Sequence, residues 1–168
     1  MIMEEKELRE KYKGVISLLT DKNITVSAME SCTGGLVASL LTDIPGASEV
    51  FKGGIVAYCN EAKIRYGVPE EVIGTYGVYS AQCAAAMAEA AASEFGTALG
   101  IGITGSLCTV DKNNSGSVPG TVYAAAAVKG SDPAAAVINA DETERYLCKM
   151  LVASAVADMI TDVCEIYG

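Results

Sequence analysis

The spacing of hydrophobic positions changes several times along the chain, and each change marks an expected element. Apolar residues three or four apart predict an amphipathic helix over residues 4–22; they are Leu8, Tyr12, Val15, Leu18 and Leu19. Similar spacing and start signals predict helices at 34–42, 69–76, 80–95 and 141–166. Short apolar runs between turn residues predict strands at 24–29, 53–59, 97–104, 120–128 and 134–140.

The order of these elements points to an α/β fold. Helices separate the early strands, as they do in parallel or mixed sheets that are covered on both faces. We therefore expect one three-layer α/β/α domain over residues 1–168, with a sheet of about five strands. A long irregular segment, residues 105–119, interrupts the pattern, and a loop of that length in a compact domain is usually functional or mobile.

Charge and hydropathy narrow the partners that we expect. Twelve basic and twenty-one acidic residues give a net charge of −9, which repels a polyphosphate backbone, so no nucleic-acid partner is expected. No segment reaches the roughly 20 uninterrupted apolar residues of a membrane span, and the first residues are charged, unlike a signal peptide. These features predict a cytoplasmic protein that does not bind membranes.

Histidine and cysteine usage limits the chemistry. The chain has no histidine, which excludes a Ser-His-Asp triad, a Cys-His dyad and any histidine-ligated metal. Its six cysteines are scattered without a CxxC pair, so neither a disulfide framework nor a zinc site is indicated. We expect no metal and no cofactor, and any general base must be Lys, Tyr, Glu or Asp.

The segment "MESCTGG" places Ser31 between the first predicted strand and the helix at 34–42. Ligands of open α/β sheets bind beyond the carboxyl ends of the strands, where a helix N-terminus attracts anions. Gly34 and Gly35 allow close approach of a ligand to the backbone, although the pattern is not a nucleotide-binding loop. The alternative is that Ser31 or Thr33 only caps the helix.

The segment "YCNEAKIRYG" supplies a candidate base for Ser31. Tyr58 lies at the end of the second predicted strand and Lys63 about one turn further on. In a chain without histidine, a desolvated lysine, alone or paired with a tyrosine, is the available proton acceptor for a serine nucleophile. The alternative is that Lys63 and Glu61 are solvated charges on a helical turn.

Five segments resemble, in order and spacing, the CinA C-terminal domain family over about residues 5–165: "AMESCTGG", "GGIVAYCNEAK", "GVYSAQCAAAMAEAA", "TG" and "GTVY". The resemblance implies a metal-independent serine amidohydrolase that converts nicotinamide mononucleotide to the acid and ammonia. It also implies that Ser31 is the nucleophile, Lys63 its base and Tyr58 a proton shuttle or orienting group. The residues implied to line the pocket are Thr104, Gly105, Gly120 and Thr121.

Roles for the residues beside Ser31 remain open at this point. Backbone N–H groups from Cys32 to Gly35 are candidates to bind an oxyanion or a substrate phosphate. Glu30 has three alternatives: to hold Lys63 charged, to bind a ribose hydroxyl, or to pair structurally with a cation, which we favour. Cys32 is a second candidate nucleophile, but a packing role is favoured because no histidine activates it. Ser80 is interpreted as a helix cap.

The chain departs from the family at two places. After Thr104-Gly105 it reads "SLCTVDKNNSGSVP" in place of Ile-Ala-Gly-Pro and a Gly-Gly stretch, and we expect residues 107–117 to be mobile and to weaken substrate affinity. Near the last helix, "NADETERYLCK" replaces a Gly-Asp-Arg segment and leaves Arg145 as the nearest arginine for a substrate anion.

Two functions therefore remain. The first is an amidohydrolase acting on nicotinamide mononucleotide or a related carboxamide, favoured by the presence of Ser31, Tyr58 and Lys63. The second is a catalytically weak or inactive nucleotide-binding or scaffold domain of the same fold, favoured by the altered loop. Alanine-rich helix faces leave room for close self-association, so a homo-oligomer is expected.

Overall fold

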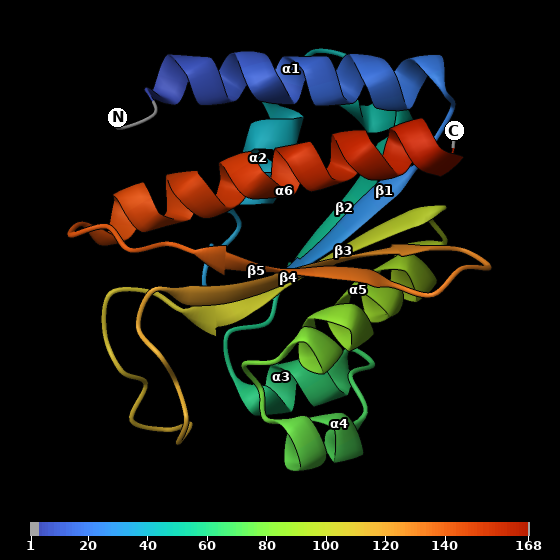
Figure 1. Ribbon diagram of the computed structural model, residues 1–168. Helices are drawn as coiled ribbons and strands as arrows, with labels where there is room; N and C mark the ends of the chain where they lie inside the picture. Colours follow the sequence, from blue (N-terminus) through green and yellow to red (C-terminus); the bar gives the residue numbers. More distant parts are fainter. Residues whose placement is uncertain (1–3, 168) are drawn as a thin grey trace.

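Five strands form one mixed sheet with the order β2-β1-β3-β4-β5 (Figure 1). The computed structural model describes residues 4–167, so residues 1–3 and 168 of the predicted domain lie outside the described residues. The strands are β1 (Val26–Glu30), β2 (Phe51–Val56), β3 (Leu99–Ser106), β4 (Thr121–Val128) and β5 (Ala134–Asn139). β1 is parallel to β2 and β3, whereas β3, β4 and β5 form antiparallel pairs. The predicted mixed sheet is confirmed.

Helices cover both faces of this sheet (Figure 1). Within residues 4–167 the helices are α1 (Glu5–Asp21), α2 (Leu36–Thr42), the short 3₁₀ helix η1 (Ala47–Glu49), α3 (Asn60–Arg65), α4 (Glu70–Tyr76), α5 (Ala81–Phe95) and α6 (Arg145–Tyr167). Helices α1, α2 and α6 pack on one face, and α5 packs on the other with α3 and α4 beyond it. The three-layer α/β/α architecture follows, as predicted.

Two of the boundaries that differ from the sequence prediction bear on the site. The last helix begins at Arg145 and not at residue 141, because the Ala140 N–H donates to the Gly120 carbonyl at 2.7 Å and keeps the chain extended beside β4. The second strand covers Phe51–Val56 and ends before Tyr58, so that residues 57–59 form the connection to α3.

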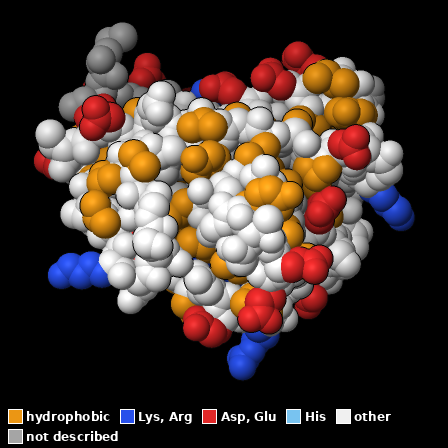
Figure 2. All heavy atoms as spheres, turned by 60° about the horizontal axis from the view of Figure 1, so that its bottom comes forward, with side chains coloured by type: hydrophobic (Ala, Val, Ile, Leu, Met, Phe, Trp, Pro, Cys, Tyr) orange, Lys and Arg blue, Asp and Glu red, His pale blue; other side chains and the backbone are white. Residues whose placement is uncertain are grey.

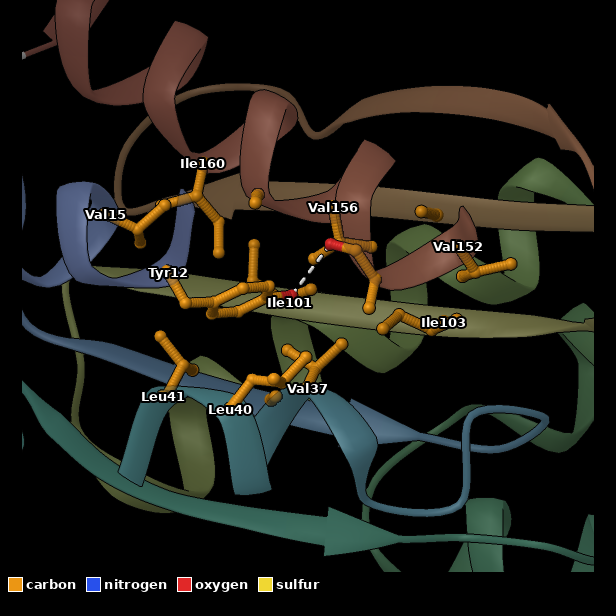
Figure 3. Packing of buried hydrophobic residues seen from close by; sticks show 14 of the residues in the cluster. Tyr12, Val15, Val37, Leu40, Leu41, Ile101, Ile103, Val152, Val156 and Ile160 are labelled. Atoms are coloured by element: carbon orange, nitrogen blue, oxygen red, sulfur yellow. Dashed lines mark hydrogen bonds between the residues drawn. The ribbon is translucent and has the colours of Figure 1, made fainter. Parts of the chain in front are cut away.

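The larger apolar core lies between α1, α2, α6 and the sheet (Figure 3). Tyr12 is fully buried there, and its hydroxyl donates to the Ala153 carbonyl on α6 at 2.8 Å. Burial raises the Tyr12 pKa well above its usual value, so the phenol stays neutral. A buried aromatic ring with a satisfied hydroxyl therefore joins α1 to α6.

On the opposite face, α5 approaches β3 closely. Gly100 and Gly102 of β3 leave no space for a Cβ atom, which would overlap the backbone carbonyls of Ala88 and Ala84. The alanine-rich sequence of α5 thus matches two glycines in the central strand, and the small residues on both sides set the separation of helix and sheet.

On the surface that carries α3 and α4, carboxylate side chains outnumber those of lysine and arginine, in keeping with the net charge of −9 (Figure 2). Within residues 4–167, none of the helices combines the length and the apolar character needed to cross a membrane.

Candidate active site

Ser31 and Lys63 meet at the carboxyl ends of two neighbouring parallel strands. Ser31 directly follows β1 and is fixed by its own N–H, which donates to the Ile103 carbonyl at 3.0 Å. Lys63 lies on α3, which follows β2 after a short connection. Its Nζ lies 3.2 Å from Ser31 Oγ and 3.0 Å from the Ala57 carbonyl oxygen. The pairing expected from the two strand ends is present in the structure.

The surroundings of Lys63 favour a neutral amine. The residue is 2% exposed, and within residues 4–167 it forms no ion pair. Desolvation is the main cause that lowers its pKa, and weak attraction to cysteine side chains and to Asp111 opposes it only in part. Lys63 is therefore not a solvated surface charge, and burial favours the neutral form of its amine more than water does.

Glu30, the last residue of β1, caps α2 from the side. One carboxylate oxygen accepts hydrogen bonds from the Thr33 hydroxyl (2.6 Å) and from the backbone N–H groups of Gly35 and Val37 (3.1 and 3.2 Å). The other accepts from the Ala38 N–H at 2.8 Å. Glu30 therefore has a structural role, but its partner is the positive end of α2 and not the cation that was expected.

This arrangement corrects two expectations about the turn. Neither Ser31 nor Thr33 caps α2; the N-cap is Gly35, whose φ of 94° is left-handed and favours glycine. Of the N–H groups from Cys32 to Gly35 that were expected to bind an anion, that of Gly35 donates to the Glu30 carboxylate and that of Gly34 to the Ser31 carbonyl. Gly34, also left-handed at φ 62°, serves the turn in the same way.

The backbone N–H groups of Cys32 and Thr33 have no acceptor in any other residue between 4 and 167. Both residues are nearly inaccessible, with 3% and 1% exposure. Unpaired N–H groups next to a candidate nucleophile are the donors that an oxyanion requires. Of the N–H groups that were predicted to bind an anion, those of Cys32 and Thr33 therefore remain as candidates.

Cys32 is unsuited to be the nucleophile. Its side chain belongs to the apolar core, and burial raises its pKa to about 12, so that the thiol keeps its proton. Because the thiolate is the reactive form, this geometry supports the packing interpretation.

A cavity of about 770 Å³ opens in front of Ser31. Five of the predicted site residues line it: Ser31, Cys32, Tyr58, Gly105 and Arg145. Further lining comes from Asn60, Glu61, Tyr79, Ser106 and the loop residues Thr109 to Asn114. A second cavity, of about 650 Å³, lies near Gly96 and Lys129 and is not lined by Ser31, so the candidate nucleophile points to the first.

Three residues expected to line the pocket do not lie on its wall. The Thr104 hydroxyl is buried and donates to the Val78 carbonyl at 2.9 Å. The Gly120 N–H and carbonyl are both used in backbone hydrogen bonds, to Leu107 and from Ala140. Thr121 begins β4 and pairs with Ser106 and Asn139 in the sheet. These three residues therefore stabilise the backbone around the site and do not contact its cavity.

Tyr58 lies at the rim of the cavity and not beside the Ser31–Lys63 pair. Its side chain is 63% exposed, and its hydroxyl accepts a hydrogen bond from Arg145 Nη2 at 3.0 Å. Among the described residues it forms no hydrogen bond with Ser31 or Lys63. The implied proton shuttle is therefore not assembled here, and Tyr58 instead holds the first residue of α6 at the cavity.

A polar network that the sequence interpretation missed anchors the long loop. Asp111 Oδ2 accepts hydrogen bonds from the Tyr79 hydroxyl (2.5 Å) and from Asn114 Nδ2 (2.7 Å), and Oδ1 accepts from the Asn113 N–H. Asn60 Nδ2, at the start of α3, donates to Asn114 Oδ1 at 3.0 Å. The hydrogen bonds to Asp111 lower the pKa of its carboxyl group, whereas burial, together with the bond to Asp111, raises the Tyr79 pKa.

The loop therefore differs from the expected unanchored segment. Residues 109–114 form one wall of the cavity and are tied to α3 and to the start of α5 through the Asp111 network. The only sign of this hydrogen-bond network in the sequence was the polar run "DKNN", which does not reveal the partners that lie far away along the chain.

Fold and site together define a three-layer α/β domain with a buried serine–lysine pair at the ends of parallel strands. The model of the CinA C-terminal domain matches residues 8–164. The chain therefore belongs to the CinA C-terminal domain family.

Curated and solved relatives agree with this assignment. A CinA-like protein of Dictyoglomus turgidum is 51% identical over 92 residues, which are 54% of this chain and 22% of that protein. The chain thus matches about a fifth of the length of that relative. The structure of the competence/damage inducible protein CihA of Agrobacterium tumefaciens has a TM-score of 0.87 at 26% identity and covers 97% of this chain and 99% of its own. A CinA superfamily protein of Escherichia coli, at 22% identity and a TM-score of 0.85, shares the fold; 97% of this chain and 95% of that one are covered.

Proposed function

We propose that the protein is a metal-independent serine amidohydrolase that deamidates nicotinamide mononucleotide, or a related carboxamide, to the acid and ammonia. The observation that carries the proposal is the 3.2 Å contact between Ser31 Oγ and the buried Nζ of Lys63. A serine hydroxyl becomes a nucleophile when a base within hydrogen-bond reach removes its proton.

The two hydrogen bonds of Lys63 suit its neutral form. A neutral amine has two N–H donors and one lone pair. With one N–H directed to the Ala57 carbonyl, the lone pair is available for the Ser31 O–H. Burial without a carboxylate partner supports the same state, because an unpaired buried ammonium is costly.

The reaction then follows in balanced steps. Lys63 takes the Ser31 proton while Oγ bonds to the amide carbon, and the carbonyl oxygen becomes an oxyanion. The Lys63 ammonium returns the proton to the nitrogen as the carbon–nitrogen bond breaks, which releases ammonia and leaves an ester on Ser31. A water molecule, deprotonated by Lys63, cleaves this ester and frees the acid and Ser31.

The oxyanion needs donors on the side of Ser31 opposite Lys63. We assign this role to the backbone N–H groups of Cys32 and Thr33, which donate to no other residue between 4 and 167. Glu30 takes no part in bond making; by holding the start of α2, it fixes the turn that presents these donors.

The cavity suits a small anionic nucleotide. Its volume of about 770 Å³ falls in the range of small-molecule sites. Arg145 and Lys112 are the cations on its wall and can attract a phosphate in an otherwise acidic protein. Asn60 and Asn114 offer amide groups suited to ribose hydroxyls.

The proposal is tested by assaying ammonia release from nicotinamide mononucleotide, nicotinamide riboside and nicotinamide. We expect release from the mononucleotide, unchanged by EDTA, and slower release from the two compounds without phosphate. Complete loss of activity with EDTA and its recovery with zinc would contradict a metal-independent mechanism. Absence of ammonia from all three compounds would favour the scaffold alternative.

A further inference from the structure

Two thiols outside the proposed active site are in contact. Cys108 Sγ and Cys148 Sγ lie 3.3 Å apart, although the residues are separated by 40 positions in the chain. Cys108 follows β3, at the base of the long loop, and is partly exposed. Cys148 is buried in the first turn of α6. None of the proposed catalytic steps uses either sulfur.

We propose that Cys108 and Cys148 are a peroxide-sensitive thiol pair that forms a reversible disulfide bond. A disulfide requires the two sulfur atoms to approach to about 2.0 Å, so each must move by less than 1 Å from its present position. Among residues 4–167, Cys108 and Cys148 are the one pair of cysteine side chains that form a hydrogen bond with each other.

The oxidant that we name is hydrogen peroxide. The sulfur of Cys108, the more accessible thiol, attacks one peroxide oxygen; a sulfur–oxygen bond forms, the oxygen–oxygen bond breaks, and the thiol proton leaves with hydroxide as water. The Cys148 sulfur then attacks the Cys108 sulfur, and the second hydroxide leaves with the Cys148 proton as water. Two thiols are oxidised by two electrons, and one peroxide is reduced to two waters.

The surroundings determine which thiol reacts first. Burial, together with the hydrogen bond to Cys108, raises the Cys148 pKa, and its S–H is within reach of the carbonyls of Ala140 and Glu142. A buried thiol that holds its proton reacts slowly with peroxide. Cys148 is therefore the resolving thiol, placed to trap oxidised Cys108 before further oxidation.

The bond would connect two walls of the cavity. Leu107 and Thr109, the neighbours of Cys108, line the cavity, and so does Arg145, three residues before Cys148. The Gly120 N–H donates to the Leu107 carbonyl and closes the base of the loop at the same place. Oxidation would thus fix the loop base to the first turn of α6.

The experiment exposes reduced protein to hydrogen peroxide, blocks remaining thiols in denaturant and maps the peptides by mass spectrometry. Wild type and Cys59→Ser, which removes an exposed cysteine, should each yield a Cys108–Cys148 peptide lacking two hydrogen atoms and sensitive to dithiothreitol. The unfolding temperature of both should rise on oxidation and fall again on reduction.

Two variants make the result decisive. Cys108→Ser should lose the cross-linked peptide and the rise in unfolding temperature. Cys148→Ala should leave a Cys108 sulfenic acid that dimedone traps; if this buried substitution prevents folding, Cys108→Ser alone decides. The proposal would be overturned if Cys108 and Cys148 were both recovered as free thiols while Cys59 is oxidised. A disulfide that includes Cys59 would overturn it as well.

Discussion

Lys63 Nζ lies 3.2 Å from Ser31 Oγ, although Ser31 directly follows β1 and Lys63 lies on α3, which follows β2. The same nitrogen donates to the Ala57 carbonyl and, within residues 4–167, has no carboxylate partner. Burial lowers the Lys63 pKa, which makes a neutral base available below the usual range of lysine titration. The predictions on activity below depend on this pair.

Replacing Lys63 with methionine keeps the volume of the buried chain but removes the base. We expect kcat to fall by about 10²- to 10⁴-fold, the usual contribution of a general base. In wild type, kcat should rise with pH because the working base is the deprotonated amine, and the rise should centre below 10.5, since the Lys63 pKa is lowered. Steady-state rates between pH 6 and pH 10 check this; a residual Lys63→Met rate with the same pH profile would contradict it.

Glu30→Gln should destabilise the protein more than an exposed substitution does. The amide retains one acceptor oxygen but places an NH₂ group where backbone N–H groups now donate, and it removes the charge that faces the end of α2. We expect a loss of about 2 kcal/mol in the free energy of unfolding, the scale of hydrogen bonds to a charged group. Urea denaturation measures it, with exposed Glu49→Gln as the matched control; equal stabilities of the two variants would be inconsistent with the cap.

Most of the fold could be predicted from the sequence because its strands and long helices have clear hydrophobic spacing. Helix α3, with six residues, is too short to show a period, and the start of α6 depends on the Ala140–Gly120 backbone contact, which local sequence does not encode. Element boundaries are therefore where sequence and structure differ.

The site was predictable in its central pair and less so around it. Strands β1 and β2 end at one edge, so the residues after them were expected to meet. The cap by Glu30 depends on a turn with two left-handed glycines, and the Asp111 network joins Tyr79, Asn60 and Asn114 across long chain separations. Such contacts depend on tertiary structure, and no spacing rule shows them.

The contact between α5 and β3 predicts opposite effects for two glycine-to-alanine substitutions. Gly102→Ala places a methyl group against the backbone of α5 at Ala84, which helix and sheet must separate to accommodate. We expect a loss of about 1–3 kcal/mol or more. Gly14→Ala, in α1 with open space around the new methyl, should instead stabilise by about 1 kcal/mol. Thermal unfolding of both variants measures the two changes in stability. A Gly102→Ala protein as stable as wild type would refute the close approach of α5 to β3.

Asp111→Ala should affect substrate binding more than chemistry. The substitution releases Tyr79 and Asn114 from the loop wall but leaves Ser31 and Lys63 in place. A loss of about 1 kcal/mol corresponds to about a fivefold higher KM with kcat nearly unchanged. Val118→Ala, an exposed loop residue outside the cavity lining, is the control. A fall in kcat at constant KM would show that the network acts on the catalytic pair.

The most direct test of the central claim compares ammonia release from nicotinamide mononucleotide by wild type, Ser31→Ala and Cys32→Ala. The hydroxyl of Ser31 contacts the base, whereas the buried Cys32 thiol has a pKa raised to about 12. We predict that wild type and Cys32→Ala release ammonia and that Ser31→Ala, folded as judged by circular dichroism, releases none above background. Near-normal release by Ser31→Ala with loss in Cys32→Ala would contradict the assignment of the nucleophile.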